Sequence, residues 1–119
     1  MKKTLCLDFD GVIHSYTSGW KGADVIPDPP VIGTREAIEK LRKDWKVVVY
    51  SSRSGQLGGK QAMSDWFINH DIQVDELCDH KPPAVIYVDD RGVTFNGSWD
   101  KCIEDINNFS HWMKITNHP

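Results

Sequence analysis

The sequence predicts an α/β domain built on a Rossmann-like, doubly wound parallel sheet in three α/β/α layers. Short apolar runs of strand length alternate with amphipathic stretches of helix length, which is the pattern that parallel βαβ units produce. The chain of 119 residues is long enough for one ordinary domain and contains no internal repeat, low-complexity tract or linker. We therefore expect a single domain over residues 1–119.

The first half of the chain contains two apolar strands and a helix between them. Residues 4–9 form an apolar run that is cut off by an acidic residue and a glycine. Residues 11–33 are rich in Gly, Pro and Ser, and such a long irregular segment in a compact domain is usually functional, so we interpret it as a flap. Apolar positions at helical spacing predict a helix over residues 32–44, and the continuously apolar residues 46–50 predict a buried parallel strand.

The second half of the chain continues this alternation. A Gly-rich loop leads to a helix predicted over residues 61–70, and residues 72–77 predict a weak strand near an edge of the sheet. The apolar residues 84–88 predict another buried strand, and an Asn-Gly turn then precedes a final helix over residues 100–112. The apolar stripe of this helix consists of Cys102, Ile103, Ile106 and Phe109.

Charge and cysteine content narrow the class of protein. The net charge is -3, which argues against non-specific nucleic-acid binding because such binding relies on Lys and Arg to neutralise phosphates. Three cysteines cannot all pair within the chain and none forms a CxxC motif, which is typical of a reduced, intracellular protein. No signal-peptide pattern is present and no apolar stretch approaches the roughly 20 residues of a membrane span. We expect a cytoplasmic protein.

Polar residues suited to phosphate chemistry follow three of the predicted strands. They are Asp8 with Asp10, residues 51–53 (Ser-Ser-Arg), and Asp89 with Asp90. Ligands of open parallel sheets bind at the carboxyl ends of the strands, so these three groups should converge. Carboxylates at short range raise one another's pKa unless a cation neutralises them, and a set of oxygen donors without clustered His or Cys favours a hard ion. The sequence therefore predicts a Mg²⁺ site.

Asp8 and Asp10 are spaced to act on one phosphorus centre. Residues i and i+2 of an extended strand face the same side, so both carboxylates can address the same group. The first can attack phosphorus, and the second can hold a proton for the leaving oxygen. Gly11 lets the chain turn sharply where the backbone must pass close to the ligand.

These features resemble, in order, the four motifs of haloacid dehalogenase (HAD) superfamily phosphatases. Residues 8–12 (Asp-Phe-Asp-Gly-Val) are similar to the first motif, and Ser51 at the end of an apolar strand is similar to the second. Lys81, just before two prolines and the next strand, resembles the third motif, and residues 89–90 resemble the acidic fourth motif. Each motif is weak alone, whereas the ordered set is specific.

The resemblance implies a catalytic role for four residues. Asp8 would be the nucleophile that forms an aspartyl-phosphate, and Asp10 would act first as general acid and then as general base. Ser51 would donate a hydrogen bond to a phosphoryl oxygen, and Lys81 would offset charge on Asp8 and on the transferring group. The chain would thus be a phosphomonoester hydrolase.

The resemblance also implies ligands for metal and substrate. Mg²⁺ would be held by Asp8, the backbone carbonyl of Asp10, and Asp89 or Asp90. Arg53 would be an additional phosphate fork, with Ser52 and Gly11 also beside the substrate.

The same resemblance predicts an open site without a sizeable cap domain. Cap insertions in the superfamily fall between the first motif and the first helix, or between the second and third motifs. The corresponding segments here, residues 11–50 and 52–80, are too short for a sizeable cap. The flap carries Trp20 near its tip, and His14 is either within reach of the site or an ordinary flap residue.

Several alternatives stay open at this point. Residues 51–53 and 89–91 look most like the phosphatase half of bacteriophage polynucleotide kinase-phosphatase, which would imply a 3′-polynucleotide phosphatase. A phosphotransferase, a non-catalytic phosphate-binding domain and a receiver-like module are the others. Receivers carry adjacent acids after the first strand and a lone acceptor Asp later, whereas this chain has the opposite arrangement. The substrate would be a phosphorylated small molecule or an exposed phosphate on a larger partner.

Overall fold

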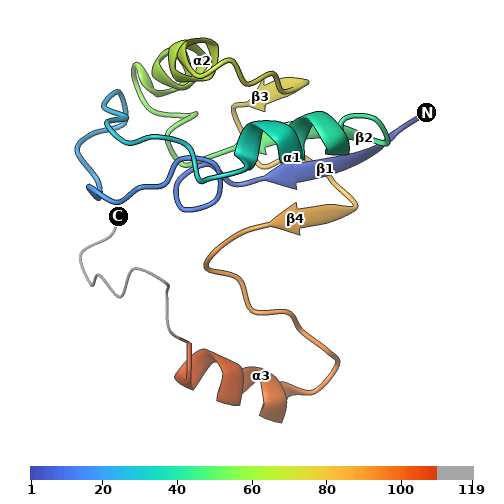
Figure 1. The fold of residues 1–119 in the computed structure, drawn as a ribbon. Coiled ribbons are helices and arrows are strands. Elements are labelled where there is room, and N and C mark those ends of the chain that lie inside the picture. Colours follow the sequence, from blue (N-terminus) through green and yellow to red (C-terminus); the bar gives the residue numbers. More distant parts are fainter. Residues whose placement is uncertain (110–119) are drawn as a thin grey trace.

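The computed structural model describes residues 1–109, in which helices and strands alternate around one parallel sheet (Figure 1). The strands lie in the order β3-β2-β1-β4, and every pairing is parallel, consistent with a Rossmann-like fold. In chain order the elements are β1 (Lys3–Leu7), α1 (Thr34–Leu41), β2 (Trp45–Tyr50), α2 (Gly59–Asn69), β3 (Glu76–Cys78), β4 (Ile86–Val88) and α3 (Trp99–Asn107). The weak strand predicted near an edge is indeed the edge strand β3.

The register of the sheet brings three strand ends to one place. On one side of β1, Leu7 pairs with Val49 of β2, and on the other side it pairs with Val88 of β4. The ladder continues one residue beyond β1, because the backbone N–H of Asp8 donates to the carbonyl of Val88 at 2.9 Å. Residues that follow β1, β2 and β4 therefore lie side by side at the carboxyl ends of the strands.

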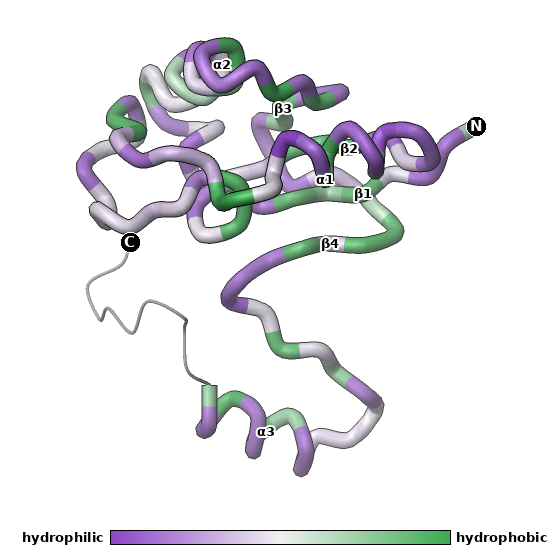
Figure 2. The backbone as a smooth tube through the Cα atoms, in the orientation of Figure 1, coloured by the Kyte–Doolittle hydropathy of each residue, from purple (hydrophilic) through white to green (hydrophobic). Residues whose placement is uncertain are grey.

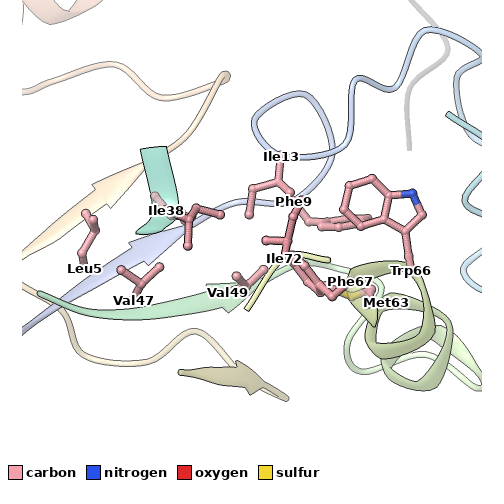
Figure 3. Packing of buried hydrophobic residues seen from close by; sticks show 11 residues of the cluster. Leu5, Phe9, Ile13, Ile38, Val47, Val49, Met63, Trp66, Phe67 and Ile72 are labelled. Atoms are coloured by element: carbon pink, nitrogen blue, oxygen red, sulfur yellow. The ribbon is translucent and has the colours of Figure 1, made fainter. Parts of the chain in front are cut away.

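One face of the sheet forms the main core with α1 and α2. Alternate residues of β1 and β2 point to this face because side chains along a strand alternate with a period of two. Phe9 and Ile13 extend the core beyond the end of β1 (Figure 3). Complete burial of one such side chain stabilises the fold by roughly 1.5–3 kcal/mol. The cluster comprises Leu5, Leu7, Phe9, Ile13, Ile38, Val47, Val49, Met63, Trp66, Phe67 and Ile72.

The opposite face of the sheet carries a smaller cluster of Cys6, Val48 and Cys78. Helix α3 stands apart from the sheet, at the end of an extended segment that follows β4 (Figure 1). The apolar residues of β4 are visible as a green stretch in Figure 2, and they are 40–43% exposed. The prediction of a buried strand at residues 84–88 was wrong, because β4 is an edge strand that no other described element covers.

The flap predicted over residues 11–33 contains no helix or strand, and backbone hydrogen bonds join its two ends to each other. The N–H of Ser15 donates to the carbonyl of Pro29 at 2.9 Å, and the N–H of Val31 donates to the carbonyl of Ile13 at 2.8 Å. These bonds anchor both ends of the flap beside the end of β1.

Every helix within residues 1–109 is too short or too polar to cross a membrane.

Candidate active site

Asp8 lies at the centre of an acidic cluster at the carboxyl end of β1. One carboxylate oxygen from each of Asp8, Asp89 and Asp90 lies within 4.8 Å of the other two. Asp8 directly follows β1, and the other two follow β4, the strand that pairs with β1. Parallel pairing of these two strands thus brings the predicted acidic residues together.

The environment of Asp8 makes its charged form costly. Burial raises the pKa of Asp8 to about 7, although the backbone N–H of Phe9 donates to its Oδ1 at 2.8 Å and opposes the rise. Repulsion from Asp89, Asp90 and Asp10 contributes to the same rise. A carboxylate that is to act as a nucleophile at neutral pH therefore benefits from a cation beside it.

The donor set of the cluster fits Mg²⁺. It consists of carboxylate oxygens from three residues, without a nitrogen or sulfur ligand, and hard divalent cations prefer such donors. The side chain of Asp10 is not part of this cluster. Its backbone carbonyl stays a predicted ligand.

Asp10 is held by one hydrogen-bond donor at each carboxylate oxygen. His14 Nδ1 lies 2.8 Å from Oδ1, and Arg53 Nε donates to Oδ2 at 2.9 Å. The Asp10 side chain keeps 15% of its surface exposed, and that part lines a polar pocket shared with Asp8. The carboxyl group is therefore fixed in orientation and still open to a ligand.

The polar pocket combines acidic, hydroxyl, cationic and aromatic groups. Ser51 and Ser52 reach it from the end of β2, Arg91 reaches it from the segment after β4, and the flap contributes two aromatic rings. Ser51 is buried, and its Oγ accepts a hydrogen bond from the N–H of Arg53 at 3.1 Å. The residues that line the pocket are Asp8, Asp10, Tyr16, Trp20, Ser51, Ser52, Asp89 and Arg91.

Lys81 lies on the other side of Asp8, in a neighbouring pocket that also includes Cys6, Tyr50 and Asp89. Its Nζ lies 4.5 Å from the centroid of the Tyr87 ring, a cation–π contact. Within the part of the chain that the structure describes, no ion pair joins Lys81 to Asp8. The structure thus places Lys81 near the predicted nucleophile without a direct bond to it.

Arg53 does not line the polar pocket. Its side chain is 0% exposed, and its Nη1 donates to the flap carbonyls of Gly22, Ala23 and Val25 at 2.8, 3.0 and 3.1 Å. The guanidinium carbon lies 4.6 Å from the centroid of the Trp20 ring. These contacts tie the flap to the site through Nε and Nη1 of Arg53, whereas Nη2 is buried without a hydrogen-bond partner among the described residues. The phosphate fork at Arg53 stays a prediction.

Gly11 also lies outside the polar pocket. It adopts a left-handed conformation with φ 84°, and its N–H donates to the carbonyl of His14 at 2.8 Å. This sharp turn after Asp10 is the one that the sequence predicted. Gly11 lines a separate apolar groove with Pro29 and Pro30, so its role here is to reverse the chain.

The sequence analysis assigned no individual role to three residues around the site. Tyr16 and Arg91 line the polar pocket, and Asp28 contacts His14 from the far end of the flap. Arg91 directly follows the acidic pair and belongs to the 89–91 resemblance, and these were the signals that pointed to it. No periodic pattern marks Tyr16 or Asp28, because the path of an irregular flap is set by tertiary contacts.

Comparison with protein-family models, with curated proteins and with solved structures found no match to this chain. The function is therefore argued from the geometry of the site itself.

Proposed function

We propose that this chain is a Mg²⁺-dependent phosphomonoester hydrolase of the HAD type that works through an aspartyl-phosphate on Asp8. The observation that carries the proposal is the meeting of Asp8 with Asp89 and Asp90 beside a pocket that also contains Asp10 and Ser51. A carboxylate nucleophile, a second carboxyl for proton transfer and a hydroxyl donor are the groups that this reaction needs.

The first half of the reaction transfers the phosphoryl group to the protein. A carboxylate oxygen of Asp8 attacks phosphorus, and the bond from phosphorus to the ester oxygen breaks. Asp10 gives its proton to that oxygen, so the product leaves as a neutral alcohol. Ser51 lines the same pocket, where its hydroxyl can orient a phosphoryl oxygen.

The second half returns the protein to its starting state. Asp10, now ionised, takes a proton from a water molecule as the water oxygen attacks phosphorus. The bond between phosphorus and Asp8 breaks, inorganic phosphate leaves, and Asp10 is again protonated. The fixed orientation of the Asp10 carboxyl serves both proton transfers.

Asp8, Asp89 and Asp90, with the backbone carbonyl of Asp10, would hold the Mg²⁺ ion. When bound, the ion would neutralise charge between the anionic substrate and the carboxylates. The protein's own contribution is to gather these oxygens at adjacent strand ends.

The proposal extends to a three-layer, doubly wound HAD-like arrangement with no sizeable cap. Helix α3 exposes Trp99, Ile103 and Ile106, and β4 is exposed as well, so both would gain stability if α3 covered that face of the sheet. Slow amide hydrogen exchange in both β4 and α3 would support this third layer. Rapid exchange throughout α3 would contradict it.

The substrate class follows from the groups around the pocket. Trp20 gives the pocket an aromatic surface and Arg91 gives it a cation, which suits a phosphoester with a ring or a second anionic group nearby. A 3′-phosphorylated oligonucleotide has both features, so a 3′-polynucleotide phosphatase is the second candidate.

A cytoplasmic location is also proposed, and it is supported by the free thiols of Cys6, Cys78 and Cys102.

The test is release of inorganic phosphate from p-nitrophenyl phosphate, sugar phosphates, nucleotides and a 3′-phosphorylated oligonucleotide. We expect release with Mg²⁺, none with EDTA, and none from Asp8→Asn. Asp44→Asn removes an exposed carboxylate just before β2, at the amino ends of the strands and away from the site. It should leave the rate unchanged. Release that persists in EDTA would exclude the metal, and release by Asp8→Asn would exclude the nucleophile.

A further inference from the structure

His14 belongs to the flap and forms hydrogen bonds through both ring nitrogens. Its side chain is 0% exposed, with Nδ1 2.8 Å from Asp10 Oδ1. On the other side of the ring, the backbone N–H of Asp28 donates to Nε2 at 3.1 Å. A backbone N–H can only donate, so Nε2 is the acceptor and the ring hydrogen is on Nδ1. His14 therefore donates its hydrogen bond to the Asp10 carboxyl group.

Three aromatic rings hold the imidazole of His14 in place. Phe9 stacks on it with a centroid separation of 5.4 Å, and Tyr16 and Trp66 contact it edge to face at 5.9 and 5.8 Å. A close-packed ring cannot flip without displacing its neighbours. The direction of the Nδ1–H group is thus set by the core of the protein.

The acceptor side of His14 is anchored as well. The carboxylate of Asp28 accepts hydrogen bonds from the backbone N–H and the hydroxyl of Ser18, at 2.8 and 2.5 Å. The backbone carbonyl of Asp28 accepts from Trp66 Nε1 at 3.0 Å. A continuous series of hydrogen bonds therefore runs from α2, through Asp28 and His14, to Asp10.

Arg53 completes the arrangement at the other oxygen of Asp10, through its Nε. Two fixed donors define the plane of the carboxyl group. Each carboxyl oxygen has two lone pairs, so one remains on each oxygen for a proton in transit. The carboxyl is therefore held rigidly without losing the ability to transfer a proton.

We propose that His14 is a positioning residue that holds the Asp10 carboxyl in the geometry for proton transfer to the leaving oxygen. This inference rests on the proposed function, in which Asp10 is the general acid. The sequence pattern does not predict this role of His14, since a histidine in the flap could equally have faced solvent.

Two variants of His14 separate its hydrogen bonds. The side-chain amide of Asn can replace Nδ1–H toward Asp10, whereas the longer Gln side chain reaches the position of Nε2 and keeps only the bond to Asp28. Phenyl phosphate and p-nitrophenyl phosphate have nearly the same shape, but phenol is the poorer leaving group and depends more on a proton donor. The readout is the ratio of kcat/KM for phenyl phosphate to kcat/KM for p-nitrophenyl phosphate, which does not depend on the fraction of folded protein.

We expect His14→Gln to lower this ratio about tenfold, His14→Asn to keep it within about twofold of wild type, and Asp10→Asn to lower it at least as much as His14→Gln. A fall in both rates at constant ratio in His14→Gln would make His14 purely structural and overturn the inference, while the proposed function would stand. Absence of hydrolysis of both esters by wild type would overturn both.

A measurement on the wild-type protein covers the case in which the variants do not fold. Long-range ¹⁵N–¹H correlation spectra identify which ring nitrogen of a histidine carries hydrogen. The inference requires hydrogen on Nδ1 of His14. Hydrogen on Nε2 alone would overturn it whatever the activity.

Discussion

Replacing Asp8 with Asn should change how the stability of the metal-free protein depends on pH. The pKa of Asp8 is raised from 3.8 to about 7 in the folded protein, chiefly by burial. A carboxyl whose pKa is higher in the folded than in the unfolded state stabilises the fold fully while both states are protonated, and progressively less as the pH rises between the two pKa values. That contribution is complete below pH 3.8 and is lost as the pH rises through about 7.

The size of the effect follows from the shift. A rise of about 3 pKa units, at about 1.4 kcal/mol for each unit, corresponds to about 4 kcal/mol of unfolding free energy. Roughly 2–3 kcal/mol of this falls between pH 5 and pH 8. Asn is close in shape to Asp and keeps an acceptor for the N–H of Phe9, so Asp8→Asn removes the charge with little change in packing.

The assay is chemical denaturation of both proteins in EDTA at pH 5 and pH 8, followed by tryptophan fluorescence. The difference in unfolding free energy, variant minus wild type, should grow by about 2–3 kcal/mol between the two pH values. Asp44→Asn, the exposed control, should show no such growth. A constant difference for Asp8→Asn would refute the reasoning that burial and neighbouring carboxylates make the charge of Asp8 costly.

Three further substitutions test buried contacts, two of them near the site and one near the start of β3. Arg53→Ala should reduce the free energy of unfolding in denaturant by about 3–5 kcal/mol, because it removes one of the two donors to the half-buried Asp10 carboxylate and the only described side-chain donor to three flap carbonyls; a loss below about 1 kcal/mol would contradict this. Gly59→Ala should lower the melting temperature, because a Cβ there would lie 2.0 Å from the carbonyl oxygen of Arg53; an unchanged melting temperature would show that the backbone yields easily. Burial raises the pKa of Asp75, but hydrogen bonds from Arg42 and from the N–H of Val47 outweigh burial and hold this pKa below its usual value. Asp75→Asn should therefore lower the free energy of unfolding at pH 7, and by progressively less as the pH falls below about 4. Denaturation measured from pH 7 to pH 3 checks this.

The arrangement of the strands could be predicted from sequence because strand patterns and strand ends are local signals. Continuously apolar runs marked β1 and β2 as the buried strands of a parallel sheet. Once the sheet is parallel, residues that follow adjacent strands must meet, which is why Asp8 and Asp89 were expected together.

The exposure of β4 and the surroundings of Arg53 could not be predicted, because both depend on contacts between distant residues. The run at residues 84–88 is as apolar as that of β2, but exposure of β4 depends on what packs against it. Arg53 follows a strand end where phosphate ligands are common, yet the carbonyls of Gly22, Ala23 and Val25 enclose it, and their position follows from the path of the flap. Irregular segments carry no periodic signal from which such contacts can be read.

The most direct test of the central claim is to trap the phosphorylated form of Asp8. In Asp10→Asn, p-nitrophenol can still leave without a proton donor, but hydrolysis of the intermediate lacks its base, so the aspartyl-phosphate should accumulate. After acid quenching, borohydride reduces an acyl phosphate to an alcohol and converts the modified aspartate to homoserine, which peptide mass spectrometry locates. We predict homoserine at position 8 only, and only when substrate and Mg²⁺ were present. Homoserine at another position, or phosphate release by wild type with no modified aspartate in either protein, would contradict Asp8 as the nucleophile.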